Sequence, residues 1–278
     1  MTDAHTARER AVRGMGVALA WVLAAALGLV GMPTASAEPP PAGSRVVAKA
    51  PVAQAPVAQT LAGKTVVLDP GHQLGNHNFP AQINALVPAG GFDKPCNTTG
   101  TATDSGYAEA TFAFRVAMVV RQRLIKRGAR VILTRKTNRE DRWGPCIDRR
   151  GRKGNRLPAD LKLSIHGDGS TSGGRGFHVI APTDRAPWTD DIFTSSRRLA
   201  RTIKARLVRR GYLPADYIAG GDGIDFRSDL GTLNLSNIPT VMVESGNMRG
   251  PDAAWMTTRS GRRAYARALT RAIRDYLE

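Results

Sequence analysis

The chain has few of the residues that mark several common protein classes. Only two of its 278 residues are cysteine and five are histidine, and aromatic residues make up 6%. Neither cysteine has another cysteine or a histidine at zinc-finger spacing, which disfavours a finger. The N-terminal apolar run, residues 16–31, is shorter than the ~20 residues of a membrane-spanning helix. The function therefore has to be sought in a small number of individual polar residues.

Acidic residues are also scarce. The chain carries 23 Asp and Glu against 40 Lys and Arg, a formal net charge of +17. Outside the cytoplasm, such a surface suits an anionic polymer of the cell wall or lipid headgroups, and the low aromatic content further disfavours nucleic acid. Much of the charge lies on predicted helices such as residues 197–210, where a solvated helix face is the plainer interpretation.

The N-terminus has the pattern of an export signal. Three arginines precede the apolar run of residues 16–31, and Ala-Ser-Ala follows at residues 35–37. This order predicts a signal peptide over residues 1–37, with a retained membrane anchor as the alternative. We therefore expect an exported protein of the periplasm or cell wall, with no stable membrane insertion after cleavage.

The next segment predicts a linker and then one folded domain. Residues 38–62 are rich in proline and alanine and repeat PVAQ, a composition that cannot form a core. Residues 63–278 form the predicted domain. In an oxidising compartment, the two cysteines, Cys96 and Cys146, are expected to form a disulfide.

Strand-like and helix-like segments alternate through the domain. Strands are predicted at residues 65–69, 130–134, 161–165, 176–181 and 240–243, and helices at 109–127, 147–156, 192–210 and 259–277. Such alternation predicts an α/β fold with a single twisted, mixed but mostly parallel sheet of about six strands and helices on both faces. Ligands of such sheets bind beyond the carboxyl ends of the strands.

Three predicted strands are followed by a strongly polar side chain: His72, His166 and Glu244. Glu109 joins them because it shares the apolar face of its predicted helix, where an unpaired carboxylate would be costly. Two imidazoles and one carboxylate are the ligand set of a catalytic zinc site, and the second carboxylate could act as the general base. Surface histidines and salt-bridged glutamates without a catalytic role remain the alternative on chemistry alone.

Several motifs carry a resemblance to a known family. DPGH at residues 69–72, SIH at 164–166 and VMVESG at 241–246 occur in order, with VILTRKTNRED and IDRRGRKGN between the first two. Together they make the domain resemble the zinc-dependent N-acetylmuramoyl-L-alanine amidases, most closely the small mycobacterial branch without a separate wall-binding domain. One departure is the spacing of 37 positions from His72 to Glu109, which leaves Asp104 as an alternative ligand and makes a long loop of residues 73–106.

The resemblance implies a function and roles for the residues. One Zn²⁺ per chain would be held by His72, Glu109 and His166, with Glu244 as the catalytic carboxylate. The reaction would be hydrolysis of the amide between N-acetylmuramic acid and L-alanine in peptidoglycan or its fragments, by a protein expected to be a monomer. Substrate contacts are predicted at four further positions, Arg135, Arg150, Asp168 and Asn247. Other candidates are an envelope zinc peptidase acting on stem peptides and a catalytically silent wall-binding regulator.

Overall fold

The computed structural model describes residues 59–278. The predicted signal peptide, and the predicted linker as far as residue 58, lie outside the described residues. No helix in this part of the chain combines the length and the apolar character needed to cross a membrane.

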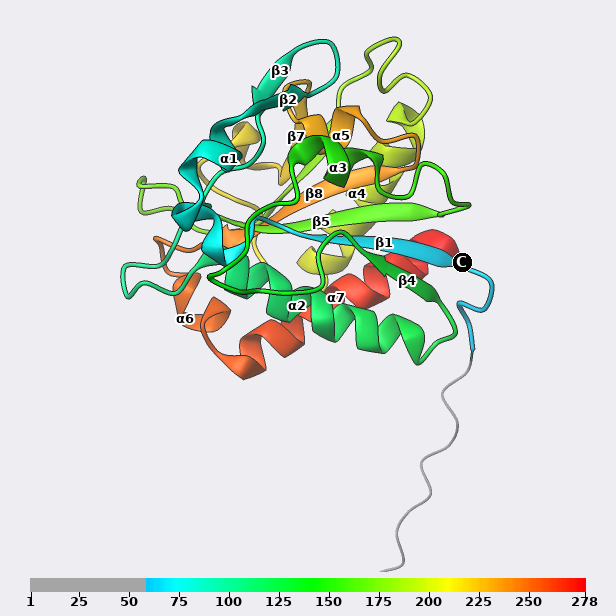
Figure 1. The fold of residues 1–278 in the computed structure, drawn as a ribbon. Helices are drawn as coiled ribbons and strands as arrows, with labels where there is room; N and C mark the ends of the chain where they lie inside the picture. The colour runs from blue at the N-terminus through cyan, green and yellow to red at the C-terminus, as the bar shows by residue number, and fades with distance from the viewer. Residues whose placement is uncertain (1–58) are drawn as a thin grey trace, which may run out of the picture. The chain divides into compact units, whose positions relative to one another are not determined.

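A six-stranded sheet runs through the domain in the order β4-β1-β5-β8-β6-β7 (Figure 1). The strands are β1 (Thr65–Pro70), β4 (Arg130–Leu133), β5 (Leu161–Asp168), β6 (His178–Pro182), β7 (Ile224–Arg227) and β8 (Thr240–Asn247). Neighbouring strands are parallel except β6 and β8. The predicted mixed, mostly parallel sheet is therefore confirmed, and the carboxyl ends of β1, β5 and β8 meet at one edge.

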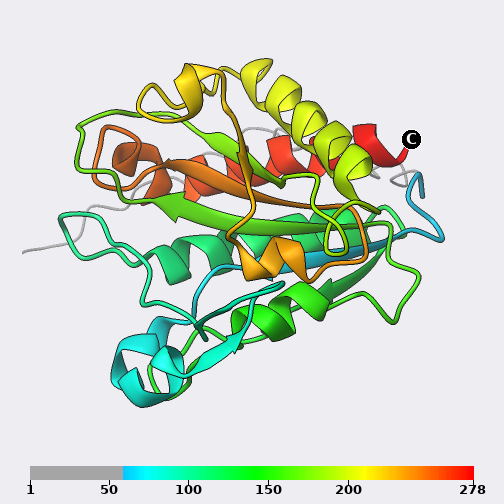
Figure 2. The ribbon, with the colours of Figure 1, turned by 90° about the horizontal axis from the view of Figure 1, so that it is seen from above.

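Three long helices cover one face of the sheet and two short ones lie on the other (Figures 1 and 2). The long helices are α2 (Glu109–Ile125), α4 (Phe193–Val208) and α7 (Arg259–Leu277), and the short ones are α3 (Ile147–Arg152) and α5 (Gly231–Asn234). The remaining elements are α1 (Pro80–Asn84), α6 (Ala253–Met256), the 3₁₀ turns η1 (Leu74–Asn78) and η2 (Ala219–Gly221), and a hairpin of β2 (Leu86–Pro88) and β3 (Asp93–Pro95).

The main core lies under the long helices because their apolar stripes face the sheet. In α2, Phe112, Val116, Val120 and Leu124 are spaced four residues apart and fully buried. The opposite face has only a small cluster formed by Ile180, Leu233 and Met242. The helix predicted at residues 259–277 matches α7, whereas α1, α5 and β7 were missed because segments of four or five residues carry little periodicity.

Two strands are longer than predicted, and the difference matters for function. β5 and β8 continue through the polar residues expected to follow them, so that His166 pairs with Glu244 across the sheet. A register shift comes next, between His166 and Asp168. These polar side chains are thus carried by rigid strands, where ladder hydrogen bonds fix their positions, and not by the loops beyond.

The predicted disulfide between Cys96 and Cys146 is present. It joins the segment after β3 to the residue preceding α3. The main chain adds a hydrogen bond at the same place, from the Ile147 amide to the Cys96 carbonyl. The long loop of residues 73–106 is therefore attached firmly to the body of the domain.

A buried ion pair lies beneath the end of β1. Arg150 donates to the Asp69 carboxylate at 2.7 Å, and the hydroxyls of Thr134 and Ser164 donate to the same carboxylate. Burial by itself raises the pKa of Asp69, but Arg150 and the two hydroxyls more than offset it, and the pKa lies well below its usual range. The carboxylate is therefore charged and fully paired in the folded protein.

Two buried arginines hold the chain that follows. The donors of Arg135 bind the carbonyls of Pro70, Gly71, Ala110 and Thr137 and the side chain of Asn138. Those of Arg150 bind Asp69 and the carbonyls of Pro70, His72, Gly144 and Pro145. Since a guanidinium has five N–H groups, all donors of both arginines are used. Both arginines thus support the turn after β1, and their contact with substrate stays a prediction.

Replacing Asp69 by asparagine should destabilise the protein strongly. The free energy of unfolding at pH 7 is expected to fall by about 3–5 kcal/mol, because the Arg150 guanidinium stays buried without its counter-charge. The lowered pKa of Asp69 means that its contribution is present above the unfolded pKa of ~3.9 and is lost as the pH falls below that value. Urea unfolding at pH 7 and pH 3 should therefore show a difference between the two proteins that narrows in acid.

Asp141→Asn is the matched control, because Asp141 forms an exposed pair with Arg139. It should leave the unfolding curve unchanged. A loss of the same size in both variants, or an Asp69→Asn effect that does not vary with pH, would contradict the assignment.

Candidate metal centre

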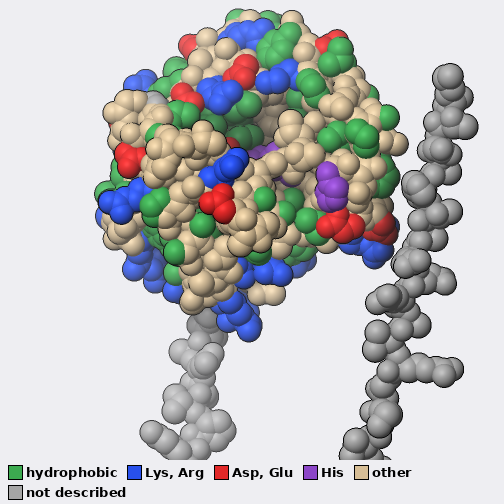
Figure 3. Space-filling model, turned by 90° about the vertical axis from the view of Figure 1, so that its left-hand side faces the viewer, with side chains coloured by type: hydrophobic (Ala, Val, Ile, Leu, Met, Phe, Trp, Pro, Cys, Tyr) green, Lys and Arg blue, Asp and Glu red, His purple; other side chains and the backbone are tan. Residues whose placement is uncertain are grey.

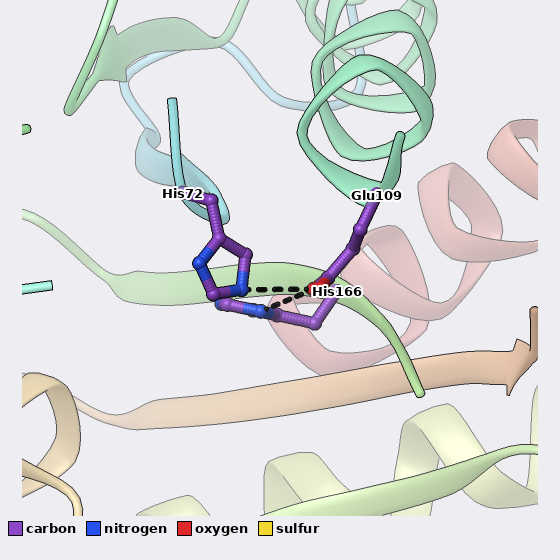
Figure 4. A group of neighbouring side chains, drawn as sticks. All are labelled: His72, Glu109 and His166. Carbon is purple, nitrogen blue, oxygen red and sulfur yellow. Dashed lines mark hydrogen bonds and ion pairs between the residues drawn. The ribbon is translucent and has the colours of Figure 1, made fainter. Parts of the chain in front are cut away.

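Three side chains from three different elements converge at the carboxyl edge of the sheet. His72 lies in the turn after β1, Glu109 is the first residue of α2, and His166 lies on β5 (Figure 4). Glu109 Oε1 lies 3.1 Å from His72 Nε2 and 2.8 Å from His166 Nδ1. One ligand atom from each residue lies within 4.8 Å of the other two.

The backbone at His72 is strained in a way that serves this placement. Within residues 59–278, His72 is the one non-glycine residue with a positive φ, 51°. A conformation of this kind costs about 1–3 kcal/mol and persists where the surroundings enforce it. Arg150 holds the His72 carbonyl, and glycine at position 71 is required because a Cβ there would lie 2.4 Å from His166 Cε1. The turn thus lets the two rings approach edge to face.

A hydrogen bond sets the tautomer of His72. Its Nδ1 lies 3.1 Å from the carbonyl oxygen of Thr98, a group that can only accept. Nδ1 therefore carries a proton, and in the neutral ring it is Nε2, facing Glu109, that has the lone pair. Such a bond to the far nitrogen is the usual orientation of a metal-binding histidine.

Glu109 is buried but fully engaged. Its two carboxylate oxygens accept hydrogen bonds from the backbone amides of Thr101 and Gly167. Burial by itself raises the pKa of Glu109, but the two histidines more than offset it and the pKa lies well below normal. The alternative ligand Asp104 is not in the cluster: its side chain is 82% exposed and lies 3.9 Å from Arg249.

The cluster has the composition of a metal site. Two imidazole nitrogens and one carboxylate oxygen match a catalytic zinc set of three protein ligands. Burial lowers and Glu109 raises the pKa of His72, and the net shift is upward, so the buried carboxylate attracts positive charge to this point. The three residues therefore fit a divalent cation.

Glu244 lies beside the cluster on β8. One of its carboxylate oxygens, Oε2, is buried and has no hydrogen-bond partner. Burial, followed by the negative charges of Glu109 and Asp168, raises the pKa of Glu244 well above its usual value. A carboxylate with a raised pKa and an unused oxygen can accept a proton near neutral pH.

A cleft of about 370 Å³ opens over these residues, and histidine side chains lie at the bottom of a hollow on that face (Figure 3). The lining is formed by His72, Lys94, Pro95, Asn97, Thr98, Ile147, Arg150, His166, Asp229, Leu230, Gly231, Thr232, Met242 and Glu244. The long loop of residues 73–106 thus supplies one wall, and the segment leading into α5 supplies another. No sequence motif marked Lys94 or Leu230 as cleft residues.

Three of the four predicted substrate contacts, Arg135, Asp168 and Asn247, lie outside this lining. The Asn247 side chain donates to the carbonyls of Ser170 and Gly174 and accepts from the Arg249 amide, so it shapes a loop. Asp168 accepts from the amide of Gly169. The Asn247 amide is thus used within the edge of the sheet, and substrate contact at Asp168 and Asn247 stays a prediction.

Comparison with known proteins agrees with the site. The family model for N-acetylmuramoyl-L-alanine amidases, Amidase_3, matches residues 66–275. The chain is 40% identical over 220 residues to the N-acetylmuramoyl-L-alanine amidase Rv3717 of Mycobacterium tuberculosis, covering 78% of this chain and 88% of that protein.

Solved structures of two mycobacterial amidases share the fold. The apo form of the N-acetylmuramyl-L-alanine amidase Ami1 from Mycobacterium abscessus superposes with a TM-score of 0.72 at 42% identity, covering 78% of this chain and all of that one. Ami1 from Mycobacterium smegmatis gives 0.72 at 39% identity, covering 78% and 98%. The chain described here therefore belongs to the Amidase_3 family of N-acetylmuramoyl-L-alanine amidases.

Proposed function

We propose that the protein hydrolyses the amide bond between the lactyl group of N-acetylmuramic acid and the L-alanine of the stem peptide, in peptidoglycan or its fragments. The observation that carries the proposal is the group of His72, Glu109 and His166 at the foot of a cleft, with the unpartnered oxygen of Glu244 beside it. Membership of the amidase family supports the choice of substrate.

His72, Glu109 and His166 would hold one Zn²⁺ per chain. When bound, zinc supplies a Lewis acid for the scissile carbonyl and lowers the pKa of water towards ~7. The protein contributes the placement of the ligands: the Thr98 carbonyl orients the His72 ring, and two backbone amides orient the Glu109 carboxylate.

Glu244 is proposed as the group that moves the proton. It takes a proton from the attacking water and transfers it to the alanine nitrogen as the C–N bond breaks. The products are a free lactyl carboxylate on the glycan and a stem peptide with a free amine. The raised pKa of Glu244 suits both halves of this transfer, since the same group must first accept and then donate.

The cleft also has a place for the peptide. With the donors of Arg135 and Arg150 all used, Lys94 is the lining cation whose position on the hairpin allows it to meet a stem-peptide carboxylate. Its ammonium group lies 3.3 Å from Asp229 on the opposite wall, so this exposed pair can exchange for a substrate carboxylate at small cost.

The segment boundaries and the location of the enzyme are proposed from the sequence. We place the signal peptide at residues 1–37, the linker at 38–62, with Leu61 already packed in the core, and the catalytic domain at 63–278, working as a monomer in the periplasm or cell wall. The charge of +17 over the whole chain, of which residues 1–37 carry only +1, favours adsorption to an anionic wall. The masses of the products distinguish this activity from that of an envelope zinc peptidase, because an amidase frees the intact stem peptide from the glycan.

Replacing Glu244 with glutamine should abolish turnover while leaving the metal bound. Because glutamine keeps the shape but accepts no proton, we expect the rate on purified muropeptides to fall about 10²–10⁴-fold. Zinc content is measured on the same protein by elemental mass spectrometry.

Glu140→Gln is the control, since Glu140 is exposed and pairs with the exposed His77. Its rate should equal that of the unchanged protein. A Glu244→Gln variant with the original turnover would refute the role of Glu244, and absence of released stem peptide from the unchanged, zinc-loaded protein would refute the reaction.

Zinc affinity should depend on His166 and on pH. His166→Gln removes one of three ligands and is expected to leave the protein folded but unable to retain zinc, whereas His77→Gln should bind zinc normally. Because the pKa of His72 is raised in the metal-free protein, protons compete with the ion, and affinity should fall by up to about tenfold for each pH unit below that pKa.

A chelator competition series at pH 7.5 and 5.5 measures both effects. Equal zinc affinity in the two histidine variants, or an affinity that does not change with pH, would show that the ion binds elsewhere.

A further inference from the structure

Five cationic side chains line a groove between α2 and α7, on the face of the sheet covered by the long helices. The groove has a volume of about 290 Å³, and its lining is Val119, Gln122, Arg123, Lys126, Arg127, Arg263 and Arg267. No carboxylate belongs to that lining. Figure 1 shows α2 and α7 packed against each other below the sheet, which accounts for cations from both helices meeting at one place.

These cations lack counter-charges. Among the ion pairs of the described residues, none includes Arg123, Lys126, Arg127, Arg263 or Arg267. The groove between α4 and α7 is different: its arginines share the lining with Asp275, which pairs with Arg206. The α4–α7 groove therefore contains one internal counter-charge, whereas the lining of the α2–α7 groove contains none.

Helix electrostatics explain the cations at the end of α2 but not those of α7. Arg123 lies in the last turn of α2, and Arg127 follows two residues after the end of the helix at Ile125, where the helix dipole favours cations. Arg263 and Arg267 are four residues apart, but they lie in the first half of α7, and Arg263 is near its amino end, where the dipole disfavours cations. Arg263 and Arg267 are therefore a like-charge pair at helical spacing, which destabilises α7.

One donor in the groove is already without a partner. The Nε of Arg123 is buried and makes no hydrogen bond, and burial followed by the charges of Arg127 and Arg267 lowers the pKa of Arg123. A buried N–H without an acceptor is costly, and an anion that entered the groove would relieve it. The guanidinium groups around it offer planar pairs of N–H donors, the geometry that matches tetrahedral oxyanions.

We infer that the α2–α7 groove is a binding site for a phosphate group, separate from the hydrolytic site. A phosphate carries up to two negative charges and several acceptor oxygens, which matches a pocket of five cations better than a single carboxylate does. Arg123 lies 14 residues beyond Glu109 on α2, about 21 Å along the helix. Phosphate in the groove and peptide in the cleft can therefore be bound at the same time.

The test uses the mature chain with Arg263→Gln and Arg267→Gln combined, since both side chains are exposed and glutamine is a good helix former. One arm titrates inorganic phosphate and pyrophosphate by calorimetry at fixed ionic strength. The other sediments the protein with phosphatidylglycerol vesicles and with phosphatidylcholine vesicles as the uncharged reference. The expected result is a dissociation constant raised at least about tenfold in the variant, the effect of two lost charge-assisted contacts.

The matched control combines Arg197→Gln and Arg201→Gln on α4, the same change of charge at the same helical spacing in the groove that contains Asp275. It should bind like the unchanged protein, and both variants should hydrolyse a soluble muropeptide at the normal rate.

Binding of free phosphate that is lost only in the α7 variant supports a soluble phosphorylated ligand. If the α7 variant loses binding only to phosphatidylglycerol vesicles, the result supports a lipid headgroup as the source of the phosphate. Equal weakening in both variants, or no binding of either probe, would overturn the inference.

Discussion

The buried pair between Asp69 and Arg150 is the interaction on which the rest of the site depends. Asp69 is the residue before the last of β1, and its carboxylate is held by Arg150, Thr134 and Ser164 from three other segments. The same guanidinium holds the carbonyl of His72. Because an uncompensated charge at this depth is very unfavourable, these segments must meet in one arrangement, and that arrangement sets His72 at its positive φ.

Glu109 joins the two histidines into one cluster. Its carboxylate lies within hydrogen-bonding distance of both rings and also accepts two backbone amides, so the position of α2 and the positions of β1 and β5 are coupled. The long loop takes part through the carbonyl of Thr98, and the disulfide attaches the same loop near α3. The loop of residues 73–106 therefore both forms a wall of the cleft and orients His72.

Much of the site could be predicted from the chain, but not every role. His72, His166 and Glu244 were identifiable because polar residues directly follow or end apolar strand patterns, and Glu109 because a carboxylate on an apolar helix face requires a partner. The supporting role of Arg135 and Arg150 could not be predicted, because the number of free donors on a guanidinium depends on carbonyls from distant segments. The role of Asn247 in shaping a loop could not be predicted either, because the carbonyls of Ser170 and Gly174 that it binds are far away in the chain.

The amino-acid sequence by itself determined the α/β alternation, the apolar stripes of α2 and α7, the pairing of two cysteines and the residue types able to hold a metal, since all of these follow from local periodicity and composition. Only the tertiary structure decided which carboxylate joins the histidines, which arginines are already used, and which loop forms the wall of the cleft. It also decided that one basic groove contains an aspartate while another has none. Those outcomes depend on contacts between segments far apart in the chain, where burial and hydrogen-bond geometry select one partner among several of the same chemical type.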